Sequence, residues 1–367
     1  MTTLHRRLFL ALRRPCSAAR AARFRRPGRG PASLLFSLIL LGLLSVCPPA
    51  ASLFASNPAG SEAPDARGVY GPTLPSTCAL YALDPELVAG WNAPLRPYEK
   101  KFIPEKYQAL PVLGGWYGEG FIPDREVLMA SGVKKAFFVG NEVHDRQKIA
   151  GSLEQLGMEI VYAPGGLWQT PECFRSMGRA FNRVERGEAL AEYAEQALAK
   201  MEKTVGSLPD DKRPSLYFGM QADGLATACR GSSRAAGLEL AGGRNVHVCP
   251  PGTENASTRI TFEQLMAYDP DVILIYEPKL FESISGHRLW SRLRAVESGR
   301  VYLVPRGPFS WLDRPATYMR LIGVQWLSNL LHPDLFPLDV PAETRVFMKL
   351  FFNVDLNDQQ LEELLNS

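Results

Sequence analysis

The sequence lacks the residue patterns that mark most catalytic and metal sites. Its five histidines are isolated, and none forms an H-x-x-x-H pair or stands beside a carboxylate at metal-ligand spacing. The six cysteines contain no C-x-x-C pair, so zinc and thioredoxin-type chemistry have no support. G-x-G-x-x-G, Walker A and G-x-S-x-G strings are also absent, which argues against nucleotide-dependent enzymes and serine hydrolases. We therefore expect a non-enzymatic protein with no metal site and no intrinsic cofactor.

Negative charge is missing from the beginning of the chain. Residues 1–33 hold nine arginines, and the first acidic residue is Glu62. Without these arginines, the remaining 32 basic and 38 acidic residues give a net charge of −6. A mildly acidic body argues against nucleic-acid binding. The 367 residues are 46% hydrophobic and 22% charged, a globular composition whose length allows two domains.

An uncharged, mostly apolar run of 13 residues, 34–46, follows the arginines. It is shorter than the roughly 20 residues of a membrane-spanning helix and has the length of the apolar region of a signal peptide. Small residues follow it up to Ala55, so we predict an export signal over 1–55; an uncleaved membrane anchor is the alternative. The string LSVC, which ends at Cys47, is similar to a lipobox with Val46 in place of a small residue, so a lipid anchor at Cys47 stays open.

Export would leave an even number of cysteines in an oxidising compartment. The four that follow the predicted signal are Cys78, Cys173, Cys229 and Cys249. The separation of 20 residues between Cys229 and Cys249 permits a disulfide between them. Four buried free thiols are the alternative, and the sequence does not decide between the two.

Short apolar runs alternate with helical patterns throughout the body of the chain. This alternation is typical of βαβ units and predicts largely parallel sheets. The predicted strands cover residues 87–89, 136–139, 160–162, 216–218, 272–275 and 301–304.

One long helix is predicted near the middle of the chain. Between Glu188 and Val205 the apolar residues recur at helical spacing, and Gly187 and Gly206 bracket the segment. The string EVLMA, which begins at Glu126, and the strand after it recur beyond this helix as EQLMA followed by another strand. This repeat predicts two lobes of similar build. The predicted parts are a linker over 56–66, an N-terminal α/β lobe over 67–186, a joining helix over 187–207 and a C-terminal α/β lobe over 208–367.

Three strings in the second half of the chain carry a family resemblance. Residues 242–246 (GGRNV), 260–265 (ITFEQL) and 269–274 (DPDVIL) resemble the iron-complex (siderophore) and vitamin B12 family of periplasmic substrate-binding proteins of ABC importers. The likeness runs from about Arg67 to about Leu331. It implies a class III bilobal fold, in which a single long helix joins two Rossmann-like lobes.

The resemblance also implies a function. The protein is expected to be a periplasmic monomer that captures a metal chelate in the cleft between its lobes. The ligand class is a ferric siderophore, haem or a cobalamin-like corrinoid. The expected partner is an ABC permease dimer with its ATPase subunits.

Site residues follow from the positions that match the family pattern. An acidic residue on each lobe docks onto permease arginines in this family, and the matching positions are Glu126 and Glu263; the alternative is that each is a solvated residue at a helix N-terminus. Aromatic and polar residues line the ligand cleft, and Arg314 would bind an anionic chelate. The alternative for Trp116 and Trp311 is a place in the core, and for Arg314 an ion pair with Asp313. The ligand-binding residues expected from the resemblance are Trp116, Tyr117, Phe309, Trp311 and Arg314. Asp223 is expected beside them because its segment follows a predicted strand, where ligands contact open α/β sheets.

Two other functions remain open at this point. An exported two-lobed enzyme or metal-cluster protein could share the lobe build, although it would need a nucleotide loop or clustered Cys and His residues. A ligand-binding component of a sensor would have the same sequence features as an importer component.

Overall fold

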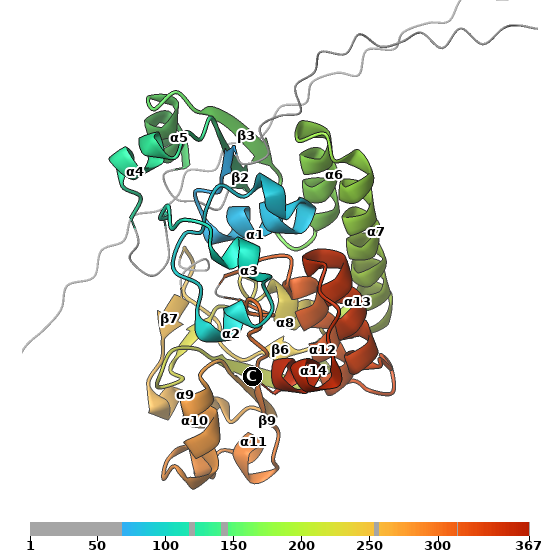
Figure 1. Ribbon diagram of the computed structural model, residues 1–367. Coiled ribbons are helices and arrows are strands. Elements are labelled where there is room, and N and C mark those ends of the chain that lie inside the picture. Colours follow the sequence, from blue (N-terminus) through green and yellow to red (C-terminus); the bar gives the residue numbers. More distant parts are fainter. Residues whose placement is uncertain (1–67, 117–121, 141–145, 253–256, 314, 367) are drawn as a thin grey trace, which may run out of the picture. The chain divides into compact units, whose positions relative to one another are not determined.

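Two parallel β-sheets and a small antiparallel pair of strands form the framework of the protein (Figure 1). The computed structural model describes residues 68–116, 122–140, 146–252, 257–313 and 315–366. No helix in these ranges combines the length and the apolar character that a membrane span requires.

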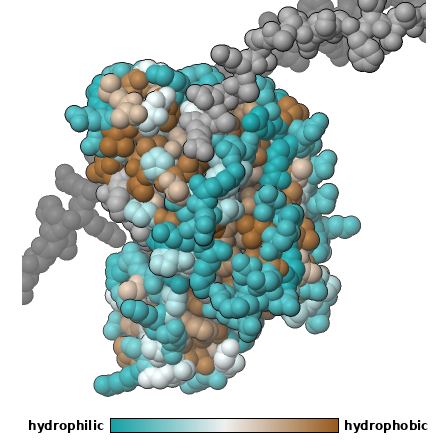
Figure 2. Space-filling model, viewed as in Figure 1, coloured by the Kyte–Doolittle hydropathy of each residue, from teal (hydrophilic) through white to brown (hydrophobic). Residues whose placement is uncertain are grey.

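The N-terminal sheet has three parallel strands in the order β1-β2-β3. Its central strand β2 buries three successive residues, 136–138, which explains why the sequence shows a continuous apolar run there. Helix α4 exposes the apolar side chains of Val127 and Met129, and Ile122, which precedes the helix, is exposed as well. Figure 2 shows hydrophobic surface in this area. The elements are β1 (Val69–Tyr70), α1 (Leu74–Leu83), α4 (Arg125–Ala130), β2 (Lys135–Val139), α5 (Arg146–Glu154) and β3 (Glu159–Ala163).

The C-terminal sheet has four parallel strands in the order β6-β4-β8-β9. The chain passes from β4 outward to β6 and then returns to β8 on the other side of β4. The strand order therefore reverses between β4 and β8, and ligands of open α/β sheets bind at such a point, beyond the carboxyl ends of the strands. The strands are β4 (Ser215–Gly219), β6 (Arg244–Asn245), β8 (Val272–Ile275) and β9 (Val301–Leu303), and β5 (Ala226–Ala228) pairs antiparallel with β7 (Ser257–Arg259).

Helices and single turns connect these strands. Between β1 and β2 lie η1 (Pro85–Leu87), α2 (Pro97–Lys100) and α3 (Glu105–Gln108). The 3-10 turn η3 (Asp210–Lys212) precedes β4. The connections of the C-terminal sheet hold α8 (Ala236–Leu240), α9 (Phe262–Tyr268), α10 (Pro278–Ser283), η4 (Ile284–Gly286), η5 (Trp290–Arg292) and α11 (Arg294–Glu297). The last part of the chain forms α12 (Arg320–Leu331), α13 (Val340–Phe352) and α14 (Asp358–Leu365).

A long helix, α7 (Val184–Met201), lies between the two sheets in the sequence and continues as one π-helical segment, η2 (Glu202–Gly206). Helix α6 (Thr170–Ala180) packs along α7 (Figure 1). The two backbones come close at Gly178 and Gly187, since a Cβ atom on Gly187 would lie 2.9 Å from the Gly178 Cα. Glycine at both positions therefore permits this helix pair.

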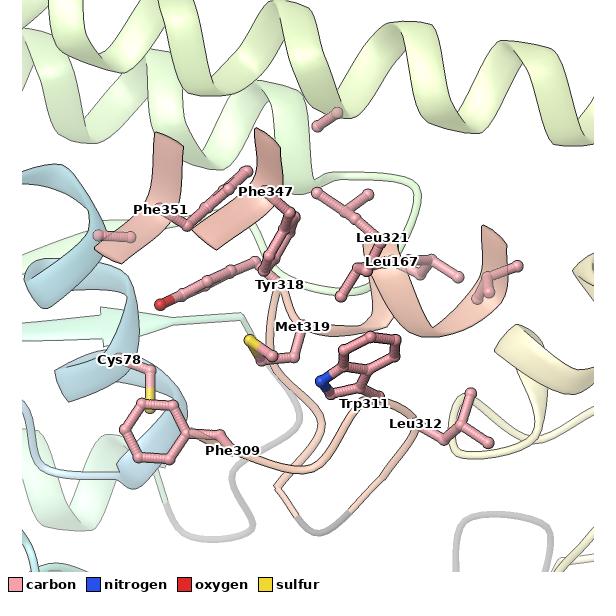
Figure 3. Packing of buried hydrophobic residues seen from close by; sticks show 14 of the residues in the cluster. Cys78, Leu167, Phe309, Trp311, Leu312, Tyr318, Met319, Leu321, Phe347 and Phe351 are labelled. Carbon is pink, nitrogen blue, oxygen red and sulfur yellow. The ribbon is translucent and has the colours of Figure 1, made fainter. Parts of the chain in front are cut away.

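The largest hydrophobic core joins the two halves of the chain. Phe137 of the N-terminal sheet and Phe218 of the C-terminal sheet belong to the same buried cluster. Residues on the opposite sheet faces, such as Phe138 and Tyr217, belong to two separate clusters, because alternate strand residues point to opposite faces. Figure 3 shows part of the shared cluster, in which Tyr318 stacks on Phe351 with 5.0 Å between ring centroids.

The strand predicted over 87–89 is wrong. Residue Leu87 ends the 3-10 turn η1, and only Val88 pairs, in an isolated bridge with Val69. The Asp84 carboxylate accepts a hydrogen bond from the Glu86 amide at 3.0 Å and so caps this turn. Three apolar residues are too few to distinguish a strand from a turn of this kind.

Replacing Gly323 by alanine tests the packing of the shared core. The added Cβ would lie 1.9 Å from the Trp311 carbonyl oxygen, so the backbone at Trp311 must move. We expect the free energy of unfolding to fall by about 1–3 kcal/mol or more, against a gain of about 1 kcal/mol in helix propensity. Chemical denaturation measures this difference. Gly151→Ala in α5 is the control, because no heavy atom lies within 4 Å of its new Cβ; equal midpoints for the two variants would contradict the packing described.

Candidate functional site

The sequence repeat around Glu126 and Glu263 corresponds to a structural repeat. Each glutamate is the second residue of a short helix, α4 or α9, and each is exposed. Each helix buries one leucine, Leu128 or Leu265, and a buried parallel strand follows. The two carboxylates therefore occupy the same position in two copies of one helix-strand unit.

Side-chain caps fix the beginning of both helices. The Asp124 carboxylate accepts a hydrogen bond from the Glu126 amide at 2.7 Å, and Thr261 forms a capping box with Gln264 at the start of α9. The backbone amide of Glu263 and the Thr261 hydroxyl, by hydrogen bonding, lower the pKa of the Glu263 carboxyl. Glu263 thus carries a full negative charge at neutral pH.

The expectation that Phe309 and Trp311 line a ligand cleft is wrong. Their side chains are 2% and 1% exposed, and Figure 3 shows both among the residues of the shared core. The Trp311 indole nitrogen donates to the Gly307 carbonyl oxygen at 3.0 Å, and its ring packs edge-on against Trp326. The alternative reading of Trp311 as a core residue is correct, because the loop after β9 enters the core between the two sheets.

Two further expected ligand residues, Tyr117 and Arg314, lie outside the described residues, and their roles stay predictions. The expected alternative partner of Arg314, Asp313, is buried and forms its ion pair with Arg234 at 2.8 Å. Removing Arg234 would leave the Asp313 carboxylate buried without this partner.

Trp116 and Asp223 lie in different surroundings. Trp116 is partly buried beside the N-terminal sheet, where its ring packs edge-on to Tyr70 at 6.4 Å. Asp223 follows β4, is exposed, and forms an ion pair with Arg259. The Arg259 guanidinium lowers the pKa of the Asp223 carboxyl, so a ligand at Asp223 would compete with an existing cation. Neither residue is buried away from solvent, and their ligand roles stay predictions.

A cluster of cationic and phenolic side chains lies at the carboxyl ends of β8 and β9. Tyr276 directly follows β8, and Arg306 comes shortly after β9. The segment around α2 contributes Arg96 and Tyr98. The Arg96 Nη1 donates to the Tyr98 hydroxyl at 2.6 Å, and the Arg306 guanidinium carbon lies 4.9 Å from the Tyr98 ring centroid.

None of the four residues of this cluster is among those expected from the sequence. The positions of Tyr276 and Arg306, within two residues of the ends of two predicted strands, were a usable signal, since polar residues there line the ligand edge of a parallel sheet. No comparable signal marks Arg96 and Tyr98, because they come from a connection of the N-terminal sheet.

Cys229 and Cys249 form a disulfide with 5.4 Å between their Cα atoms. The structure thus has the disulfide and not the alternative of four buried free thiols. His247 lies beside it, with its Nε2 2.6 Å from the Thr258 hydroxyl and its Nδ1 3.1 Å from the Tyr268 hydroxyl. The possible ligand atoms of Cys229, His247 and Cys249 lie within 4.8 Å of one another. Both sulfurs are in the disulfide, and a disulfide offers no thiolate to a metal ion.

The remaining described cysteines, Cys78 and Cys173, are buried free thiols. Burial raises the pKa of the Cys173 thiol to about 12 and raises that of Cys78 as well. Both are therefore unreactive at neutral pH.

Two lobes with parallel sheets, a long helix between them in the sequence and polar side chains at strand ends define a bilobal binding protein. The sequence profile of a family described as "Periplasmic binding protein" matches residues 170–307. An ABC transporter solute-binding protein from Sulfurospirillum deleyianum DSM 6946 is 30% identical, with a TM-score of 0.76 over 83% of this chain and 95% of that chain. The chain belongs to this family of periplasmic solute-binding proteins of ABC transporters.

Two more distant relatives have names that state a ligand. The Fe(3+)-citrate-binding protein YfmC of Bacillus subtilis (strain 168) is 26% identical over 161 residues. That match covers 42% of this chain and 47% of the relative, so the chain spans about half the length of the curated relative it matches. The molybdate periplasmic binding protein MolA of Haemophilus influenzae is 16% identical with a TM-score of 0.63, over 81% of this chain and 96% of that chain, and shows the fold alone.

The comparisons confirm the predicted class III fold with two Rossmann-like lobes. They also confirm that the chain is of a binding-protein family and not an enzyme. The two-lobed enzyme considered from the sequence is therefore excluded.

Truncating Trp311 should act on stability. Because the indole is buried in the shared core, we expect Trp311→Ala to lower the free energy of unfolding by about 3–5 kcal/mol. The control is Trp168→Ala, since Trp168 is 50% exposed and should cost far less. Denaturant unfolding of both variants distinguishes them, and a Trp311→Ala protein as stable as the wild type would show that the indole is not a core residue.

Proposed function

We propose that the protein is the substrate-binding component of an ABC importer, which captures a metal complex and delivers it to a membrane permease dimer with its ATPase subunits. The observation that carries the proposal is the pair of exposed glutamates, Glu126 and Glu263, at the same helix position in both lobes. The proposed location is the periplasm, and the proposed oligomeric state is a monomer. A lipid anchor at Cys47 is a further proposal.

Two carboxylates on separate lobes suit a two-fold symmetric partner. Each can meet the basic residues of one permease subunit, so that the pair fixes the orientation of the binding protein. A favourable interaction with the helix dipole explains one N-terminal glutamate. The helix dipole does not require an exposed glutamate at the same position in both lobes. The presence of the pair therefore favours an importer component over a sensor component.

The proposed ligand is a metal chelate, with ferric siderophores, haem and cobalamin-like corrinoids as the candidate classes. A relative named for binding ferric citrate supports an iron complex. In the part of the chain that the structure describes, Cys229, His247 and Cys249 lie close enough together to hold a metal ion. The disulfide between the two cysteines leaves no thiolate to bind one. A bare ion would need several such ligands, so we favour a complex that brings its own.

Reversing the two charges tests the docking role. We expect Glu126→Arg together with Glu263→Arg to abolish uptake of radiolabelled ferric citrate by cells that carry the importer, because arginine would repel the basic permease residues. Calorimetry should give an unchanged ligand affinity. Glu192→Arg, at an exposed glutamate of α7, is the control and should transport normally. Normal uptake by the double variant would refute the docking role, and a loss of ligand binding would place these residues in the binding site instead.

A further inference from the structure

We infer that Arg96, Tyr98, Tyr276 and Arg306 form a binding site for the carboxylate groups on the outside of an anionic metal complex. This inference rests on the proposed function and names the substrate class more closely. Arg96 and Arg306 both lie over the Tyr98 ring, and Tyr276 is close enough to interact with all three residues. Tyr276 and Arg306 follow β8 and β9, next to the reversal of strand order between β4 and β8. Open α/β sheets bind their ligands at such a place.

Two guanidinium groups share one aromatic ring at this site. The guanidinium carbons of Arg306 and Arg96 lie 4.9 and 5.8 Å from the Tyr98 ring centroid. Each arginine is attracted by the ring, whereas the two like charges beside it repel each other. An anion between or beside them would remove that repulsion.

Arg306 has unused capacity for hydrogen bonding. Its Nε atom is buried and has no hydrogen-bond partner among the residues that the structure describes. None of the ion pairs formed within those residues includes Arg306. A buried charged donor without a partner is costly, so a ligand oxygen here would be bound strongly.

The carboxylate nearest in sequence, Glu99, does not fill this role. Glu99 is 8% exposed and accepts a hydrogen bond from the Arg96 backbone amide at 2.7 Å, which caps α2. Burial raises the pKa of the Glu99 carboxyl, and the carboxylate is already used as the cap of α2. These three residues, Arg96, Arg306 and Glu99, comprise two guanidinium groups and one carboxyl, and that carboxyl already caps α2.

The donor set indicates which chemistry it would recognise. The planar fork of an arginine matches a carboxylate with two parallel hydrogen bonds. Burial raises the pKa of both Tyr98 and Tyr276, so both phenols stay protonated and can donate to chelate oxygens. The site therefore suits a complex such as ferric citrate, whereas a ferric trihydroxamate without free carboxylates gains little from it.

Calorimetry with four probes tests this assignment: ferric citrate, free citrate, inorganic phosphate and a ferric trihydroxamate. We expect Arg306→Gln and Arg96→Gln each to raise the dissociation constant for ferric citrate by about 10- to 100-fold. Arg306→Lys should lose less affinity for ferric citrate than Arg306→Gln, since lysine keeps the positive charge but not the two parallel donors of the guanidinium. Arg179→Gln, at an exposed arginine paired with Glu172 on α6, is the control and should bind like the wild type.

The outcomes separate this inference from the proposed function. Wild-type affinity for ferric citrate in both glutamine variants, with unchanged melting curves, overturns the carboxylate site and leaves the proposed function standing. The same follows if the trihydroxamate binds the wild type as tightly as ferric citrate. Equal affinity for free citrate and ferric citrate supports the carboxylate site but contradicts delivery of a metal complex. Phosphate binding as tight as ferric citrate binding overturns the carboxylate assignment. A wild type that binds no metal complex overturns both.

Discussion

The packing of aromatic side chains from both halves of the chain into one core is the constraint on which the rest of the structure depends. Tyr81 and Trp91, from the first half, lie 5.8 and 6.3 Å by ring centroids from Phe352 and Phe309. Burying aromatic rings is worth several kcal/mol for each side chain, so the two halves cannot separate there at low cost. Arg186 of α7 adds a polar link, because its guanidinium donates to carbonyl oxygens of α1 and α13.

The same core holds the cationic cluster in place. Phe102 follows α2 and is 2% exposed. A Cβ on Gly307 would lie 2.7 Å from the Phe102 ring, so the chain next to Arg306 packs directly on the segment that carries Arg96 and Tyr98. The residues that we assign to the ligand are thus fixed by contacts that also join the lobes, and a binding site of this kind is preorganised.

Local sequence patterns predicted elements better than they predicted surroundings. The apolar runs of β2, β4 and β8 and the periodicity of α7 are properties of short segments, and these four elements are present. Whether Trp311 faces a ligand or the core depends on α12 and Trp326, which no local pattern specifies. The contacts of Arg96 with Tyr276 and of Tyr98 with Arg306 depend on the tertiary fold in the same way. For this reason the sequence pointed to other ligand residues.

A distance between the lobes, with and without ligand, is the most direct test of this account. Spin labels can be attached at Gln147→Cys on α5 and Glu282→Cys on α10, since both positions are exposed. The protein used begins after residue 55, and its native cysteines do not react with the label because they are buried or in the disulfide. Because one core joins the lobes, double electron–electron resonance with saturating ferric citrate should shift the distance by no more than about 2 Å, the scale of small helix adjustments. A shift several times larger would show that the lobes close like a hinge and that the core does not hold them together.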